Sequence, residues 1–597
     1  MSGTIEARLQ RLRELMKDRG LAAYLIPTDD FHSSEYVGEY FKAREYMSGF
    51  TGSAGTLAVL EKQAALWTDG RYFIQAEEQL RGSSILLMKA GQPGVPALGE
   101  YLEAHLAKGS KVGFDGRCVT KQFVDRIADK TRKKKIVFCG EEDLVALIWD
   151  DRPNLSARPV WELDKRYAGL SREEKLSMVR DKLKEQGADR LLVTALDEIA
   201  WLLNLRGGDV RNTPVFLAYL LLDETRAVLY AQPQIFPEDI RRKLEQAGVA
   251  IAPYEAIEAG VKALPAGVRL LADGRRVNYR LLHAIPAKVE WIDGASPIEG
   301  LKAVKTSEEM EHMRQAHIKD GAALTRFMWW LKTHAAGEQI TEMGAASQLE
   351  AFRKAEEGYL GSSFDPIIAY GAHGAIVHYE ATPETDAVMQ PRGLCLADTG
   401  GHYLEGTTDV TRTIALGEIT EEERHAYTIV LRGHLNLAAA RFLYGACGQN
   451  LDILAREPLW AEGLDFNHGT GHGVGYLLNV HEGPQSFRWR MKEAEYVPLE
   501  EGMVISNEPG FYLEGRFGIR HENLMLCRKG ERNEYGQFMY LEPLTMAPFD
   551  RDAIDRTLLT ERELALLNAY HEKVYETLAP HLEGDVLAWC REVTAPL

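Results

Sequence analysis

The chain has 597 residues, of which 45% are hydrophobic and 26% are charged, and its formal net charge is −18 at pH 7. This length is too great for one hydrophobic core and predicts roughly three or four domains. The acidic balance argues against a nucleic-acid partner, because phosphate binding needs a basic surface. No run approaches about 18 uninterrupted apolar residues, so we expect no membrane span.

The cysteines and the first residues bear on the compartment. The six cysteines are scattered and form no Cys-x-x-Cys pair, which is typical of a reducing cytosol and not of a disulfide framework. The chain starts Met-Ser-Gly-Thr-Ile-Glu-Ala-Arg, without the basic segment and apolar run of a secretory signal. We therefore expect a cytoplasmic protein.

The first elements in chain order are those of an α/β domain. An amphipathic helix is predicted over residues 5–18, followed by an apolar strand over 22–27. Residues 53–60 and 64–68 are two short apolar runs separated by Glu-Lys-Gln, which indicates a β-hairpin.

The same order of elements recurs further along the chain. Ser171-Arg-Glu-Glu174 is a capping box that starts a predicted helix up to about residue 186. A strand over 190–194 follows, and then a hairpin formed by 215–222 and 227–231. The sequence therefore predicts a second α/β domain on the plan of the first. The boundary is predicted in the proline-rich segment 151–159.

The remaining chain has a different pattern, in which helices are segregated from antiparallel strands. Capped helices are predicted from Thr306 to about residue 334, after Thr341 and after Thr420. Strands are predicted over 394–398, 409–416 and 519–527. This arrangement indicates an α+β domain.

Five ligand-type residues lie in short glycine-rich motifs of this third region. They are Asp398, Asp409, His472, Glu508 and Glu522. Four carboxylates at one place repel each other at neutral pH, and a pair of divalent cations removes that repulsion. No single member is decisive, because an aspartate after a strand is usually a turn former. The joint pattern predicts a binuclear metal site.

The loop around the histidine ligand excludes two other kinds of site. In His468-Gly-Thr-Gly-His472-Gly-Val-Gly475 the third glycine is at the wrong offset for a dinucleotide fingerprint. Glycine at every second position also opposes the helix of a His-Glu-x-x-His zinc site. We expect a loop or strand end that presents imidazoles. Glu508 precedes Pro509-Gly510, which predicts extended backbone followed by a turn.

These motifs resemble those of the pita-bread metallopeptidases, and most closely those of the three-domain cytosolic Xaa-Pro aminopeptidases. Other parts of the chain resemble the same family, namely residues 48–55, 67–73, 194–207, 564–569 and 592–597. The resemblance implies an α+β fold, with two related creatinase-like α/β domains before a C-terminal pita-bread catalytic domain. The expected limits are 1–155, 156–305 and 306–597, the last with a C-terminal extension.

The resemblance also implies how the ligands share two metal ions. Asp409 and Glu522 would bridge the ions, Asp398 would bind one of them, and His472 and Glu508 would bind the other. Ligation dominated by oxygen suits a hard divalent ion, and the family implies Mn²⁺.

Further residues are carried over from the family motifs. His378, His468 and His481 would hold the substrate and polarise its carbonyl. Tyr512 and Arg520 would support the bridging ligands, although Arg520 could instead be a structural ion-pair partner of Glu522.

Three positions depart from the family pattern. His373 stands where asparagine is common, and the run Ser363-Phe-Asp365-Pro replaces the more usual Ser-Phe-Pro-Thr. These two changes affect the expected fit of the substrate. His521 replaces an aliphatic residue beside Glu522, and by strand alternation it is expected to face away from the metals.

The predicted activity is release of the N-terminal residue from peptides with proline in the second position. A hydroxide bridging the metals would attack the scissile carbonyl, Glu508 would shuttle the proton, and the substrate's α-amine would bind near Asp398. The alternatives are an Xaa-Pro dipeptidase, a metal-free hydrolase of the creatinase type, and a pita-bread binding module without catalysis. The resemblance implies a homodimer with contact between C-terminal domains. The preferred first residue, the peptide length limit and the physiological substrate do not follow from the sequence.

Overall fold

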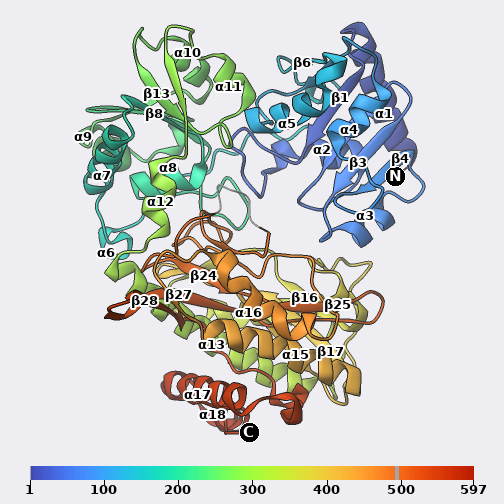
Figure 1. The fold of residues 1–597 in the computed structure, drawn as a ribbon, viewed down its shortest axis with the longest axis vertical. Coiled ribbons are helices and arrows are strands. Elements are labelled where there is room, and N and C mark those ends of the chain that lie inside the picture. The colour runs from blue at the N-terminus through green and yellow to red at the C-terminus, as the bar shows by residue number, and fades with distance from the viewer. Residues whose placement is uncertain (1, 491–495) are drawn as a thin grey trace. The chain divides into compact units, whose positions relative to one another are not determined.

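A computed structural model of the chain describes residues 2–490 and 496–597, which form two units (Figure 1). The first unit runs to Leu163 and also includes Leu170–Ile298. The second comprises Asp164–Gly169 and Glu299–Leu597.

The first sheet of the first unit confirms the predicted strand and hairpin. Its strand order is β4-β3-β2-β1-β5-β6. The strands are β1 Ala23–Pro27, β2 Thr56–Leu60, β3 Ala64–Thr68, β4 Ile85–Lys89, β5 Lys111–Phe114 and β6 Val137–Cys139. β2 pairs antiparallel with β1 and β3, whereas β5 runs parallel to β1.

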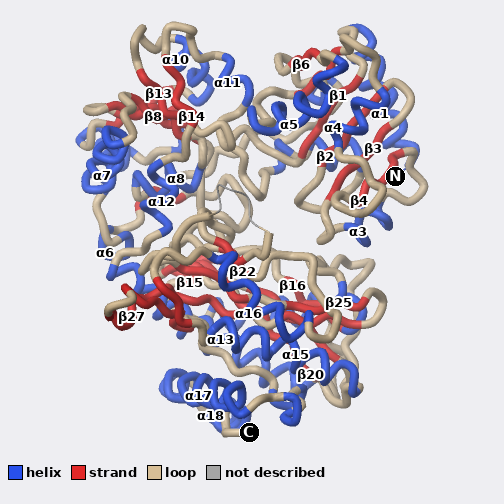
Figure 2. The backbone as a smooth tube through the Cα atoms, viewed as in Figure 1, coloured by secondary structure: helices blue, strands red, loops and turns tan. Residues whose placement is uncertain are grey.

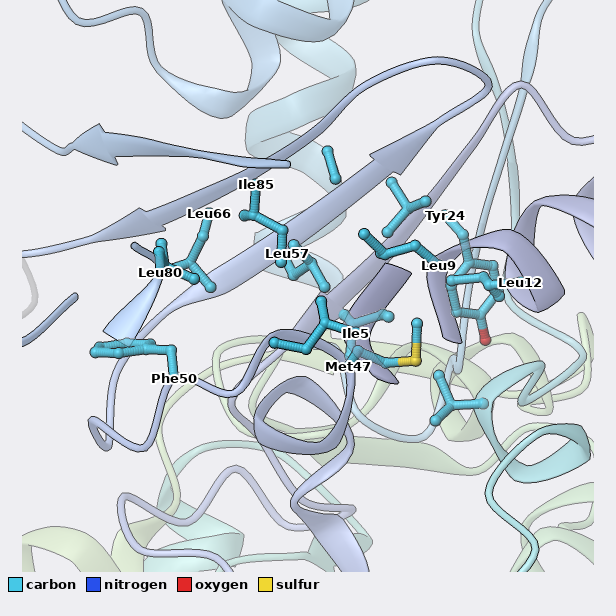
Figure 3. Close-up of a cluster of buried hydrophobic side chains, with 14 of the residues drawn as sticks. Ile5, Leu9, Leu12, Tyr24, Met47, Phe50, Leu57, Leu66, Leu80 and Ile85 are labelled. Atoms are coloured by element: carbon cyan, nitrogen blue, oxygen red, sulfur yellow. The ribbon is translucent and has the colours of Figure 1, made fainter. Parts of the chain in front are cut away.

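Helix α1 (Ser2–Asp18) covers this sheet because its apolar residues recur at helical spacing. Ile5, Leu9 and Leu12 lie on one stripe of the helix and are buried in the same cluster as Tyr24 and Leu57 (Figure 3). The predicted helix over 5–18 is therefore confirmed, with its start three residues earlier.

The second sheet of this unit has the equivalent order β12-β11-β10-β8-β13-β14. Its strands are β8 Arg190–Val193, β10 Ala218–Asp223, β11 Ala227–Ala231, β12 Val249–Ala252, β13 Arg269–Ala272 and β14 Glu290–Asp293. The predicted capping box is present at the start of α7 (Arg172–Glu185), where the Ser171 hydroxyl accepts from the Glu174 amide. The two halves of the unit thus share one plan, as the repeated order of elements predicts.

The second unit combines long helices with antiparallel sheets (Figure 2). Its main helices are α13 Ser307–His334, α14 Glu342–Lys354, α15 Glu421–Ala438, α16 Gly448–Trp460, α17 Glu561–Leu578 and α18 Gly584–Val593. The three predicted helices correspond to α13, α14 and α15. Side chains Thr306, Thr341 and Thr420 cap them as predicted.

Two antiparallel sheets carry the motifs of interest. One has the order β16-β17-β20, and the other has the order β21-β28-β27-β24. The strands are β16 Ile367–Tyr370, β17 Leu394–Thr399, β20 Val410–Ala415, β21 Arg441–Leu443, β24 Val504–Asn507, β27 Asn523–Asn533 and β28 Gly536–Pro543. The hairpin β25 (Gly510–Leu513) and β26 (Phe517–Arg520) lies between β24 and β27 in the chain.

The prediction of one continuous strand over 519–527 is wrong. The strand is interrupted at His521 and Glu522, because β26 pairs with β25 whereas β27 pairs with β24. The Glu522 amide instead donates to the Thr411 carbonyl. This change of partner brings Glu522 to the start of strand β20.

A buried ion pair fixes the turn that follows β17. Arg353 of α14 donates from Nε to Asp320 of α13 over 2.7 Å, and both side chains are buried. The same guanidinium donates to the Thr399 hydroxyl and to the Gly400 carbonyl. The end of β17, which carries Asp398, is therefore tied to two helices.

Candidate metal centre

Three ligand-type side chains from separate segments converge inside the second unit. Asp409 directly precedes β20, His472 ends the short strand β22 (Gly471–His472), and Glu522 lies between β26 and β27. Their ligand atoms all lie within 4.8 Å of one another. Asp409 and Glu522 are buried, so two carboxylates meet an imidazole away from bulk water.

The other two predicted ligands border this group. Glu508 Oε1 lies 3.3 Å from His472 Nε2, and Asp409 Oδ2 lies 3.5 Å from the same nitrogen. Asp398 lies in β17 opposite Thr411 of β20, and the charges of Asp409 and Glu508 act on it. The structure thus brings all five predicted ligands to one place.

The glycine before His472 allows its strand to approach β24. A Cβ atom at Gly471 would lie 2.0 Å from the Ser506 carbonyl oxygen, a distance that no side chain tolerates. The His472 amide donates to the Ser506 hydroxyl, which in turn donates to Glu508. The motif with alternating glycines is therefore a strand end that presents an imidazole, as predicted.

Electrostatic repulsion among these groups is strong. Burial, followed by the charge of Asp409, raises the pKa of Asp398 to about 6 even though Arg520 opposes the shift. Burial and the neighbouring carboxylates raise the pKa of Glu522 well above its usual range. Burial lowers the pKa of His472, but its hydrogen bond to Asp409 and the charge of Glu508 outweigh this and raise it to about 9. The bare cluster therefore holds protons at neutral pH.

Two oxygen atoms of the cluster lack a partner that a cation would supply. Within the described part of the chain, the buried atoms Asp398 Oδ1 and Glu522 Oε1 have no hydrogen-bond partner, an arrangement that costs stability when nothing binds there. A donor set of carboxylate oxygens with one imidazole suits hard divalent cations. The residues present fit such ions.

A hydrogen-bonded chain runs along one side of the cluster. Arg520 donates to Asp398 and, over 2.8 Å, to the Tyr512 hydroxyl. His468 Nδ1 lies 2.7 Å from the Gly469 carbonyl and therefore carries the proton, so Nε2 accepts from Tyr512 over 2.8 Å. Burial and the charge of Arg520 lower the pKa of His468 to about 3. His468 is thus a neutral acceptor facing Tyr512.

The alternative explanation for Arg520, an ion pair with Glu522, does not describe the structure. The carboxylate that pairs with Arg520 is Asp398, whereas Glu522 accepts from the Thr411 hydroxyl over 2.7 Å.

The other two predicted histidines lie beside the cluster. The ring of His481 meets the ring of His472 edge to face, with centroids 4.2 Å apart. His378 follows Val377, whose carbonyl accepts from Arg520. The sequence motifs thus bring both histidines next to ligand-type residues or their partners.

The structure shows the contacts of His373 and His521, two of the residues that differ from the family pattern. His373 Nδ1 lies 2.8 Å from Oε1 of the buried Glu342, and its ring stacks on Tyr379. Because Tyr379 also donates to Glu342, this contact anchors the loop that carries His378. His521 Nε2 donates to the Tyr427 carbonyl, and the prediction that His521 faces away from the ligands is confirmed.

Sequence reasoning missed the hydroxyl partners of the carboxylates. Thr411 donates to Glu522, and Ser506 donates to Glu508. Each hydroxyl residue lies two positions before or after a ligand, Thr411 after Asp409 and Ser506 before Glu508. That period-two spacing places it on the same strand face and could have identified it.

The site defines a class: a buried carboxylate and imidazole centre for divalent cations in an α+β domain that follows two α/β sheets. Residues 311–529 match the model of metallopeptidase family M24, and 537–597 match the C-terminal region of peptidase_M24. Residues 8–146 and 151–309 match models of the creatinase/prolidase N-terminal domain.

Full-length relatives narrow the assignment. Aminopeptidase P2 of Arabidopsis thaliana is 39% identical over 99% of this chain and 89% of its own length. A probable Xaa-Pro aminopeptidase P of Laccaria bicolor is 40% identical over 99% and 93%. The chain belongs to metallopeptidase family M24 and, within it, to the group of Xaa-Pro aminopeptidases P.

A solved structure agrees with this assignment. The crystal structure of X-prolyl aminopeptidase from Caenorhabditis elegans, described as a cytosolic enzyme with a di-nuclear active site, is 33% identical, covers 100% of both chains and has a TM-score of 0.94. The fold is thus two creatinase-type α/β domains followed by a pita-bread catalytic domain. Across the described residues, no helix has the length and apolar character that a bilayer span requires.

Proposed function

We propose that this chain is a metal-dependent aminopeptidase that releases the N-terminal residue from peptides whose second residue is proline. The observation that carries the proposal is the convergence of Asp409, His472 and Glu522 within 4.8 Å, in a chain that matches Xaa-Pro aminopeptidases over its whole length. The limits 1–155, 156–305 and 306–597 are proposed for its three domains.

Five side chains would hold two divalent ions, which we propose to be Mn²⁺. Asp409 and Glu522 would bridge them, Asp398 would bind one, and His472 and Glu508 would bind the other. Such a pair of ions supplies a hydroxide nucleophile at neutral pH and stabilises charge on the attacked carbonyl. The unpartnered oxygens of Asp398 and Glu522 support this assignment.

The remaining site residues would handle the peptide and the proton. Glu508, at the edge of the cluster, would move the proton to the leaving nitrogen. His378 and His481 would hold the substrate carbonyl. His468 would act with them through Tyr512, because its Nε2 accepts from that hydroxyl. Arg520 would hold Tyr512 and Asp398 in place for the substrate's α-amine.

Cleavage of short peptides separates this proposal from its nearest alternative. We expect Mn²⁺-loaded protein to release arginine from Arg-Pro-Pro and to act at least about 100-fold more slowly on Arg-Ala-Pro, a discrimination of about 2.7 kcal/mol. Amino-acid analysis of the products measures both rates. Cleavage of Xaa-Pro dipeptides but not of Arg-Pro-Pro would identify a dipeptidase, and no cleavage of either would favour a binding module.

We also propose that the chain forms a cytoplasmic homodimer through its second unit. Trp460 and Trp489 are each 38% exposed and meet edge to face, with ring centroids 5.7 Å apart. Large exposed aromatic side chains of this kind are enriched at protein interfaces. Sedimentation velocity is expected to give a dimer for the wild type and a shift toward monomer for Trp460→Ser. A wild type that sediments as a monomer at micromolar concentration rules the dimer out.

A further inference from the structure

We propose that helix α17, in the C-terminal region, is a positioning element of the metal centre that acts through Tyr570 and Arg412 on Glu522. The inference rests on the proposed role of Glu522 as a metal ligand. It assigns a function in metal binding to the C-terminal region, residues 537–597. None of the five proposed ligands lies in that part of the sequence.

Arg412 connects directly to the segments that carry the bridging residues. It lies in β20 and is fully buried. Its Nη1 donates to the Glu522 carbonyl over 2.7 Å and to the Thr411 carbonyl over 2.9 Å, and its Nη2 donates to Asn523 Oδ1 over 2.8 Å. Since Thr411 in turn donates to the Glu522 carboxylate, Arg412 fixes both ends of that contact.

The other donors of Arg412 reach the C-terminal region. Nη2 donates to the Tyr570 hydroxyl over 3.0 Å and to the Ala547 carbonyl over 2.8 Å, and Nε donates to the Pro548 carbonyl over 3.0 Å. The guanidinium also lies 4.2 Å above the Phe549 ring. The Phe549 amide donates to Nε2 of His571, the residue after Tyr570. The plane of the guanidinium is thus set by α17 and the segment before it.

The charge of Arg412 has no direct counter-ion. Among the residues that the structure describes, the acceptors of Arg412 are all neutral oxygens, and Arg412 forms no ion pair. A buried cation is costly unless hydrogen bonds satisfy it, and here the neutral acceptors and the face of the Phe549 ring surround the guanidinium. Its hydrogen bond to the Glu522 carbonyl holds the backbone of that residue in place, as partners of metal ligands commonly do.

The Tyr570 hydroxyl is the point at which α17 enters this network. It accepts from Arg412 and donates toward the Ala547 and Thr545 carbonyls, at 2.9 and 3.0 Å. Replacing it by phenylalanine removes one acceptor of Arg412 while keeping the ring. Arg412 itself is a poor test residue, because its loss leaves several buried acceptors unpaired at once.

The test titrates chelator-stripped full-length protein with Mn²⁺ and compares wild type, Tyr570→Phe and Tyr575→Phe by calorimetry. Tyr575 undergoes the same chemical change on the same helix, where it packs against the cluster of Val574, Leu578 and Cys590. We expect Tyr570→Phe to bind at least one Mn²⁺ equivalent about ten-fold more weakly, and Tyr575→Phe to bind as the wild type does. Urea unfolding of the metal-free proteins, in parallel, monitors packing alone.

Three results overturn the inference, and they can be told apart. If the wild type binds two ions and Tyr570→Phe binds them equally tightly, α17 is only a packing element and the proposed function stands. If the wild type binds no Mn²⁺, the proposed function fails and the inference falls with it. A loss of affinity that Tyr575→Phe shares in full also contradicts a specific role for Tyr570.

Discussion

Replacing Glu522 by glutamine is expected to abolish peptidase activity and to lower metal affinity by more than about 100-fold. Loss of a residue that only hydrogen-bonds a metal ligand lowers affinity by up to about 100-fold, and loss of a bridging ligand should have a larger effect. An amide is neutral and offers one acceptor oxygen where the carboxylate offers two, so it cannot bridge two cations. Glu522 is 1% exposed and lies among Asp409, His472 and Thr411.

Elemental analysis together with the rate of Arg-Pro-Pro cleavage measures this effect. The matched control is Glu542→Gln on β28, which removes a carboxylate that pairs with Arg314 outside the cluster. We expect this control to retain its metal and its activity. A Glu522→Gln protein that keeps two ions per chain would remove Glu522 from the bridging position.

Removal of the divalent ions by a chelator is expected to affect both activity and stability. It should abolish activity and lower the free energy of unfolding, because ions that bind only the folded state contribute about 2.7 kcal/mol per site at a free concentration 100 times Kd. Reloading at pH 7 should release protons, since ligands must be deprotonated to bind. The pKa of His472 is raised to about 9, and that of Glu522 is raised by burial and its neighbours.

The pH dependence of this release follows from the same shifts. Above pH 9 His472 is already neutral in the metal-free protein, so its contribution disappears and fewer protons are released on loading. Calorimetric titrations with Mn²⁺ in two buffers of different ionisation enthalpy count the protons. Equal heats in both buffers at pH 7 would show that the bare cluster does not hold protons.

The sequence predicted the convergence of residues whose motifs determine the local backbone. Asp398 lies in β17, Asp409 directly precedes the antiparallel partner strand β20, and alternating glycines let His472 approach β24, so these residues converge as the motifs suggest. The repeated α/β plan is likewise visible from the periodicity of helices and hairpins. Both sheets show it in the same strand order.

What the sequence did not reveal depends on contacts between distant segments. The strand predicted over 519–527 is broken because its two halves pair with different partners. Arg412 lies three residues after the predicted ligand Asp409, but its proposed role follows from Tyr570, 158 positions along the chain. The anchoring of His373 by Glu342 is of the same kind. No local pattern encodes such tertiary pairings.

Anomalous diffraction from crystals of protein purified without chelator and loaded with Mn²⁺ locates the metal ions and identifies their ligands. We expect two manganese peaks about 3.5–4 Å apart. Asp409 and Glu522 should contact both, Asp398 one, and His472 with Glu508 the other. A single peak, or peaks away from these five side chains, would contradict a binuclear centre built by this ligand set.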